Sequence, residues 1–103
     1  MTQTNQANLK TRPAIFFDRD GVLNKDRDYV YKIDDWYWIE GAIEAIKRCN
    51  ELDYYVFVVT NQSGIGRGYY TEEDVHTIHT YMEDELKNHG AHIDAIRYCP
   101  HHR

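Results

Sequence analysis

The stretch "IFFDRDGVLN", residues Ile15 to Asn24, decides how this chain is organised. Three apolar residues run directly into two aspartates that are one residue apart, and a glycine follows. Aspartate is a poor strand residue and is costly to bury without a partner. A buried strand that ends on two carboxylates therefore indicates a site where something else compensates their charge.

Three short apolar runs predict strands. "AIFFD" (Ala14 to Asp18) is continuously apolar up to its aspartate, which is typical of a strand buried on both faces of a parallel sheet. "YYVFVVT" (Tyr54 to Thr60) predicts a second buried strand, and "IDAIRYC" (Ile93 to Cys99) predicts a third, which Pro100 ends.

Two helices are predicted between these strands. The first has apolar residues at helical spacing on one face: Ala42, Ala45, Ile46, Cys49 and Leu52. The second begins after the N-cap residue Thr71, ends near Gly90, and has an apolar inner face: Val75, Ile78, Met82 and Leu86. Strands that alternate with amphipathic helices predict an α/β fold, a Rossmann-like parallel sheet with flanking helices.

The chemically unusual residues all follow the predicted strands. In a parallel sheet, ligands bind beyond the carboxyl ends of the strands. Those ends carry Asp18, Arg19 and Asp20, then Thr60, Asn61, Gln62 and Ser63, and finally Cys99, Pro100, His101 and His102. The sequence therefore predicts one active site at this edge of the sheet.

The paired aspartates suit phosphoryl chemistry. One carboxylate can attack a phosphate while its neighbour handles a proton, and Mg²⁺, a hard cation with oxygen ligands, can neutralise both. The glycines of "GIGRG", residues 64–68, permit a tight backbone near a phosphate. For "DRDG" and "TNQSG" taken singly, an ordinary solvated turn is an equally good interpretation.

Composition narrows the classes of function. The chain has 103 residues, enough for one small domain, and a net charge of −5, which argues against nucleic acid as the main partner. No apolar run is long enough to span a membrane. Residues 1–12 are polar, read as a flexible tail and lack a secretory signal, so the default location is the cytoplasm. The histidines at 76, 79, 89 and 92 are expected at the surface or its boundary.

In order and spacing, these motifs resemble the haloacid-dehalogenase-like (HAD-like) phosphohydrolases, with "DRDG" as the first motif and Thr60 as the second. Three longer blocks look like the zinc-containing D,D-heptose 1,7-bisphosphate phosphatases, which are relatives of the histidinol phosphatases: "AIFFDRDGVLNKDRDYVYKID", "VVTNQSGIGRGYYTEED" and "IRYCPHH". The resemblance extends over residues 13–103 and implies the N-terminal portion of a HAD-like phosphatase domain.

The resemblance implies a role for each matching residue. Asp18 would be the nucleophile that becomes phosphorylated, and Asp20 would be the general acid and then the general base. The carboxylate of Asp18 and the backbone carbonyl of Asp20 would bind Mg²⁺. The expected contacts to the phosphate and the rest of the substrate, a small sugar phosphate such as D-glycero-D-manno-heptose 1,7-bisphosphate, come from Arg19, Asp26, Tyr29, Thr60, Asn61, Gln62 and Ser63.

The resemblance also implies a structural zinc site, of which Cys99 and His101 would be the first two ligands. In such phosphatases two further cysteines, a basic residue and a late acidic motif follow, and none of these lies before Arg103. We therefore expect weak or absent turnover by these 103 residues alone, half of a zinc site, and an exposed sheet edge at "AIFFD". A full-length version is expected to be a monomer.

Three alternatives stay open. A histidinol-phosphate phosphatase would share the zinc loop, although "TNQSGIGRG" is closer to the heptose enzymes. Polynucleotide 3′-phosphatases have a similar "TNQ-x-GIGRG" block, but the "CPHH" element and the acidic balance argue against them. The third is a module that binds phosphate without hydrolysing it.

Overall fold

The structure, a computed structural model, describes residues 11–100 of the chain. The predicted ligand His101 and most of the predicted tail lie outside these residues. The elements are β1 (Ala14–Asp18), the 3₁₀ helix η2 (Ile33–Asp35), α1 (Ala42–Glu51), β2 (Tyr55–Asn61), α2 (Ser63–Gly66), α3 (Glu72–Asn88) and β3 (Ala95–Cys99).

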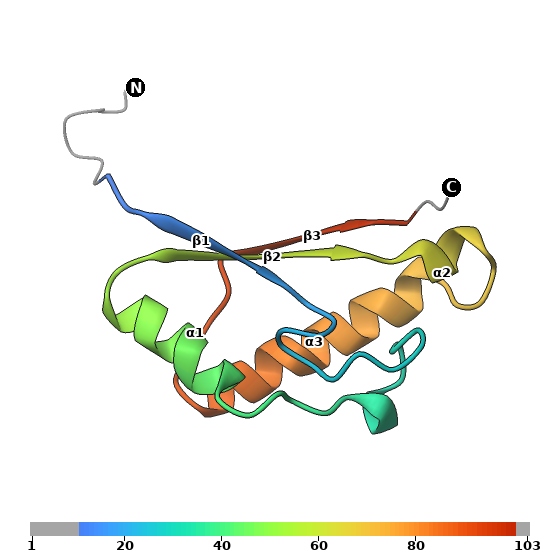
Figure 1. Ribbon diagram of the computed structural model, residues 1–103, viewed down its shortest axis with the longest axis horizontal. Coiled ribbons are helices and arrows are strands. Elements are labelled where there is room, and N and C mark those ends of the chain that lie inside the picture. Colours follow the sequence, from blue (N-terminus) through green and yellow to red (C-terminus); the bar gives the residue numbers. More distant parts are fainter. Residues whose placement is uncertain (1–10, 101–103) are drawn as a thin grey trace.

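The strands form a three-stranded parallel sheet in the order β1-β2-β3. Phe16 pairs with Phe57, and Phe57 pairs with Ala95 on its other side. In Figure 1, α1 and α3 lie together on one side of this sheet. The predicted α/β fold with a parallel sheet and flanking helices is confirmed.

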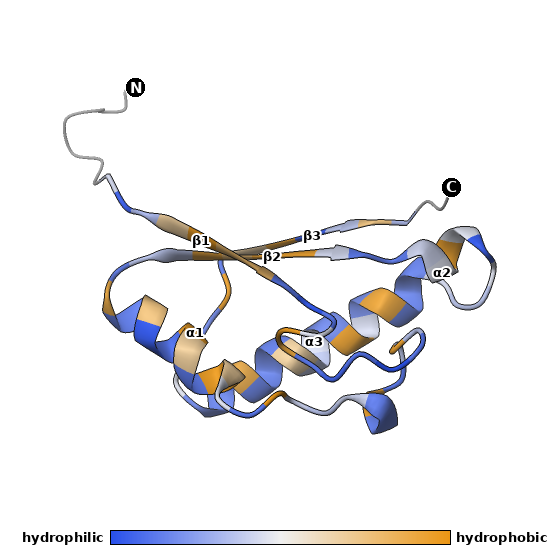
Figure 2. Ribbon diagram, viewed as in Figure 1, coloured by the Kyte–Doolittle hydropathy of each residue, from blue (hydrophilic) through white to orange (hydrophobic). Residues whose placement is uncertain are grey.

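The core lies between the sheet and these two helices. Val56 and Val58 of β2 are fully buried, and they pack with Ile46 of α1. The inner face of α3 completes this cluster with Ile78, Met82 and Leu86. Figure 2 shows β1 apolar along its middle and hydrophilic in the loop beyond its end.

β1 is not buried on both faces, and this part of the prediction is wrong. Its residues alternate between exposed and partly buried, and Phe16 is 63% exposed. Ile15 and Phe17 pack against the core, so Phe16 and Asp18 face the opposite side by strand alternation. Among residues 11–100, the helices cover only one face of the sheet, and β1 forms an edge, as expected.

The sequence signals at the ends of α3 are confirmed. Thr71 forms a capping box with Asp74: the Thr71 hydroxyl accepts from the Asp74 N–H, and the Asp74 carboxylate accepts from the Thr71 N–H. Gly90 follows the C-cap residue His89 with a positive φ of 77°, which glycine adopts without strain. The predicted glycine-rich loop differs, since its first residues form the short helix α2.

The two faces of the sheet predict unequal costs of truncation. We expect Met82→Ala to lower the free energy of unfolding by about 2–5 kcal/mol, because it leaves a cavity in the core. Phe16→Ala removes a larger side chain but should cost about 1 kcal/mol or less, mostly its ring contact with Phe57. Urea unfolding of both variants measures the difference, and equal costs would contradict the one-sided core.

Candidate active site

A pocket of about 270 Å³ opens at the carboxyl ends of β1 and β2. Its lining residues come from the loop after β1, the end of β2, the start of α2 and the segment between α2 and α3. Its lining residues are Asp20, Asp26, Asp28, Tyr29, Asn61, Gln62, Ser63 and Tyr70. All of them except Asp28 and Tyr70 are residues that the sequence analysis predicts for the site.

The two aspartates of "DRDG" have contrasting environments. Asp18, at the end of β1, is exposed and makes no side-chain hydrogen bond or ion pair with the part of the chain that the structure describes. Asp20 is held by several donors. Its Oδ1 accepts from Nε and Nη2 of Arg19 at 3.1 and 2.7 Å and from Asn24 at 2.9 Å.

The second carboxylate oxygen of Asp20 is bound more loosely. Oδ2 accepts from the Thr60 hydroxyl at 3.4 Å and from Gln62 Nε2 at 3.3 Å. These distances exceed those of the contacts to Oδ1, and neither donor is charged. Oδ1 therefore anchors Asp20, and Oδ2 is the more weakly held of its two oxygens. Thr60 does not line the pocket but contacts Asp20, which does.

Arg19 lies beneath the pocket and does not line it, which differs from the predicted substrate contact. Its side chain is fully buried, with Nη2 donating to Asp20 and to the Val30 carbonyl at 2.8 Å. Its Nη1 lies 3.2 Å from Nε2 of His79, and Trp36 packs near the guanidinium. A buried cation needs acceptors on all sides, and Arg19 finds them inside the fold. Its role here is to position Asp20.

Tyr70 fixes the orientation of Gln62. The Tyr70 hydroxyl donates to Gln62 Oε1 at 2.5 Å, so the amide directs Nε2 toward Thr60 Oγ1, at 2.8 Å, and Asp20. Burial raises the pKa of Tyr70 above its ordinary value, so this hydroxyl is a donor at neutral pH. A side chain at Gly64 would overlap the Tyr70 ring, so this glycine permits the close approach.

His79 is buried, so its predicted position at the surface or its boundary is wrong. It is 5% exposed, and its ring packs against Tyr98 of β3. Burial, followed by the charge of Arg19, lowers the pKa of His79 from 6.5 to about 4. Position 79 does fit the apolar spacing of Val75, Ile78 and Met82 on α3, and this is the signal that could have indicated burial.

Asn24, Asp28 and Tyr70 are further site residues that sequence reasoning did not assign. Asn24 is fully buried and donates to Asp20, and it is the last residue of "IFFDRDGVLN". Asp28 lies between the predicted residues Asp26 and Tyr29. Tyr70 gives no comparable signal, because its place depends on how the chain turns after α2.

The described residues do not assemble a zinc site. Cys99 is an exposed free thiol at the end of β3, and His101 lies beyond residue 100. Among residues 11–100 there is no group of three or more His, Cys, Asp and Glu side chains that could hold a metal. Cys49 is partly buried and packs against the core, in line with its predicted place on α1.

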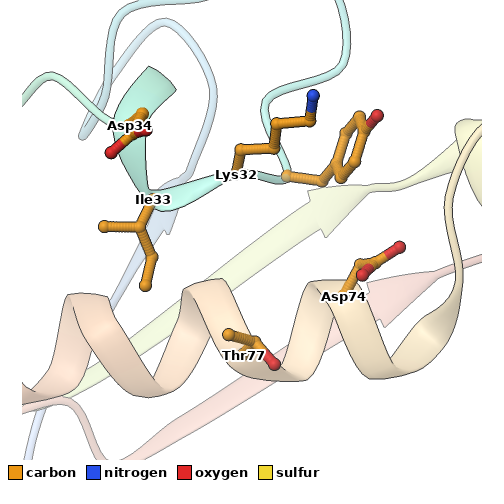
Figure 3. A pocket seen from close by; sticks show the side chains of 6 residues that line it. Lys32, Ile33, Asp34, Asp74 and Thr77 are labelled. Carbon is orange, nitrogen blue, oxygen red and sulfur yellow. The ribbon is translucent and has the colours of Figure 1, made fainter.

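A second pocket, of about 360 Å³, lies between the segment around η2 and α3 (Figure 3). It is lined by Tyr31, Lys32, Ile33, Asp34, Asp74 and Thr77. None of these residues is predicted for the site, and Asp74 already serves the capping box of α3. The pocket at the carboxyl ends of the strands is therefore the candidate active site.

Residues 13–98 match the family described as polynucleotide kinase 3 phosphatase. The chain belongs to this family. The matched residues include the "DRDG" motif after the first strand and Thr60 near the end of the second. The predicted resemblance to HAD-like phosphatases is thus confirmed. No helix among residues 11–100 of this family member is long and apolar enough to cross a membrane.

Relatives of this family member are named heptose phosphatases. It is 48% identical over 96 residues to the D-glycero-beta-D-manno-heptose-1,7-bisphosphate 7-phosphatase of Rhodopseudomonas palustris, covering 93% of this chain and 53% of the relative. It is 44% identical to the Escherichia coli K12 enzyme of the same name, covering 90% and 49%. The chain spans about half the length of the curated relatives it matches.

Solved structures agree with this match. The D,D-heptose 1,7-bisphosphate phosphatase from B. bronchiseptica, complexed with magnesium and phosphate, superposes with a TM-score of 0.84 at 40% identity, covering 87% of this chain and 51% of that one. The corresponding enzyme from Burkholderia thailandensis gives 0.67 at 39% identity, covering 85% and 53%.

The contact between Gly64 and Tyr70 predicts a coupled effect on stability. Gly64→Ala should lower the free energy of unfolding by about 1–3 kcal/mol, because the new methyl group displaces the Tyr70 ring. In a Tyr70→Ala background the same change should cost less than about 0.5 kcal/mol. A double-mutant cycle by urea unfolding measures the coupling, and additive costs would refute it.

The pKa of His79 predicts a pH dependence of folding. The unfolded chain binds this proton near pH 6.5 and the folded chain only near pH 4, so stability present above 6.5 is lost as the pH falls toward 4. When the pH is lowered from about 7 to about 5, the free energy of unfolding of the native chain should fall by roughly 2 kcal/mol more than that of the His79→Gln variant. Urea unfolding at both pH values tests this, because the other histidines contribute equally to both proteins.

Proposed function

We propose that this chain carries the catalytic aspartates of a Mg²⁺-dependent phosphomonoesterase that acts on a small sugar phosphate. The substrate is D-glycero-D-manno-heptose 1,7-bisphosphate, from which the 7-phosphate is removed through an aspartyl-phosphate intermediate. One observation carries the proposal: of two carboxylates one residue apart, Asp18 has no partner among the described residues and Asp20 is anchored through Oδ1.

The unpartnered carboxylate of Asp18 is the nucleophile in the first step. One of its oxygens forms a bond to phosphorus while the bond from phosphorus to the sugar oxygen breaks. Asp20 enters this step protonated on Oδ2 and gives the proton to the leaving sugar oxygen. The phosphate is then carried by Asp18, and Asp20 is ionised.

The second step reverses the role of Asp20. Its Oδ2 accepts a proton from a water molecule that attacks phosphorus, and the bond between phosphorus and Asp18 breaks. Inorganic phosphate leaves, Asp18 is a free carboxylate again, and Asp20 again carries the proton. The Arg19 contacts to Oδ1 keep Oδ2 directed toward the reacting groups in both steps.

The other predicted residues divide between phosphate and sugar. Thr60 and Asn61, at the end of β2, hold the transferring phosphate, and Gln62 and Ser63 position the substrate beside them. Across the pocket, Asp26 and Tyr29 face the sugar, where a carboxylate can accept hydrogen bonds from hydroxyls and an aromatic ring can cover an apolar face.

The oxygen donors at this edge fit Mg²⁺. This ion usually takes one or two carboxylates, keeps several waters and binds substrate phosphate, so it needs no group of three acidic side chains. The free carboxylate of Asp18 and the backbone carbonyl of Asp20 would hold it. When bound there, Mg²⁺ supplies positive charge that offsets the carboxylates and the phosphate. The described residues do not support zinc in the same way.

The charge of the pocket favours a small sugar phosphate over a nucleic-acid strand. Asp20, Asp26 and Asp28 line it, and no Lys or Arg among residues 11–100 does so. A polynucleotide brings several phosphates, which such a surface repels. The relatives that share nearly all of this chain are named for a sugar bisphosphate, which agrees with this preference.

A second candidate function is phosphate binding without hydrolysis. It is favoured by the position of Asp18, the proposed nucleophile, which is not among the described residues that line the pocket beside Asp20. Isothermal titration with phosphate and Mg²⁺, followed by a turnover assay, separates the two. Binding without phosphate release would favour this candidate, and release from the heptose bisphosphate would exclude it.

The proposed nucleophile gives a direct test. Asp18→Asn should abolish phosphate release from the heptose bisphosphate and the binding of beryllium fluoride, an acyl-phosphate mimic, while the fold is retained. Beryllium fluoride with Mg²⁺ should shift the NMR signals of residues 18, 20 and 60 in the native chain, even if turnover is slow. Asp84→Asn, at an exposed aspartate on α3, is the matched control. Equal activity of Asp18→Asn and the native chain would rule out the covalent mechanism.

A further inference from the structure

A continuous series of side-chain contacts connects helix α3 to Asp20, the proposed acid and base. His79 of α3 is 5% exposed, and its Nε2 lies 3.2 Å from Nη1 of Arg19. Arg19, which is fully buried, in turn donates Nε and Nη2 to the Oδ1 of Asp20. Of these three residues, only Asp20 lines the candidate active-site pocket.

We propose that His79 is a positioning residue for Asp20, acting through the guanidinium of Arg19. The proposal rests on the proposed function for the role of Asp20 as acid and base. The contacts themselves do not depend on it. His79 touches neither the pocket nor Asp20 directly, so its effect must pass through Arg19.

The chemistry of arginine fixes the form of His79. A guanidinium only donates hydrogen bonds, so Nε2 of His79 must offer a lone pair and the ring proton must sit on Nδ1. A protonated His79 would turn a second N–H toward the cation and lose the contact. The charged or titratable groups around His79 are Arg19 and Asp20 from the loop after β1, His76 on its own helix, and Tyr98 on β3.

The neutral imidazole therefore completes the set of acceptors around Arg19. Nε and Nη2 are taken by Asp20, Nη2 also reaches the Val30 carbonyl, and Nη1 has His79. Without His79, Nη1 would be buried without an acceptor, and the guanidinium could rotate to find one. Rotation would weaken the pair of contacts on Oδ1 and free Asp20 to turn Oδ2 away from the pocket.

The first test reads the contact in the native chain. Nitrogen-15 NMR of the His79 ring at neutral pH should show a protonated Nδ1 and an unprotonated Nε2. The signal of Arg19 Nη1–H should exchange slowly with water. A proton on Nε2 would overturn the proposal, and this measurement needs neither a variant nor turnover.

The second test separates positioning from packing. His79→Gln keeps an acceptor, His79→Leu removes it, and His76→Leu is a matched control at an exposed histidine on the same helix. In the Leu variant the carboxyl carbon-13 resonance of Asp20 should shift and broaden, while those of Asp26 and Asp28 stay unchanged. The Gln variant should retain the native Asp20 signal. His79→Phe replaces the Leu variant if the latter does not fold.

The third test is kinetic. With the heptose bisphosphate and Mg²⁺, His79→Leu should lower kcat about tenfold and change KM by less than about twofold, and His79→Gln should restore most of the loss. An unchanged Asp20 resonance in a folded apolar variant, or equal losses for Gln and Leu, would overturn the proposal. An inactive native chain would count against the proposed function alone, because the Asp20 resonance decides the positioning without turnover.

Discussion

The carboxyl edge of the sheet depends on one buried cation, the guanidinium of Arg19. A charge with no exposure is tolerated only when acceptors surround it, and Arg19 has a carboxylate, a backbone carbonyl and an imidazole. Its own carbonyl also accepts from Leu23 and Asn24, which closes the loop after β1. The same residue thus holds the loop and the carboxylate within it.

This arrangement explains how two aspartates one residue apart can serve different roles. Asp18 ends a strand and faces the side of the sheet opposite to the helices, so it finds no partner among the described residues. Asp20 lies two residues further, in the closed loop, where Arg19, Asn24 and the end of β2 converge on it. A nucleophile needs a free lone pair, and an acid and base needs a fixed direction. Arg19, the residue between them, produces this difference because its guanidinium holds Asp20.

Much of this could be predicted from the sequence. Apolar runs indicated the strands, the spacing of Val75 and Met82 indicated α3, and parallel topology then brought the strand ends to one edge. These signals are local, and the location of the site then follows because ligands bind beyond the carboxyl ends of the strands in a parallel sheet. They also indicate the pocket residues at the end of a strand or just after it, such as Asn61 and Gln62.

Two of the remaining features depend on tertiary contacts that no local pattern encodes, and the third has a local signal. Arg19 stands between two aspartates, where a charged side chain is expected to face solvent. Its side chain is nevertheless fully buried. Tyr70 meets Gln62 because α2 reverses the chain, with Gly64 giving room for the ring. His79 is polar, and yet its position on α3 follows the apolar stripe. In each case a polar residue is buried because another residue of the fold completes its hydrogen bonds.

The open face of the sheet connects the stability of this fold to its chemistry. Phe16 and Asp18 share that face by alternation, and Phe16 packs its ring against Phe57, which also stacks on Tyr55. An exposed aromatic edge is an aggregation liability, and an exposed carboxylate is a hydrated and therefore weakened nucleophile. Because both residues lie on one face of β1, a surface that covered Phe16 would come close to the carboxylate of Asp18. For the nucleophile proposed at Asp18, covering this face would therefore bury the aromatic edge and reduce the hydration of the carboxylate together.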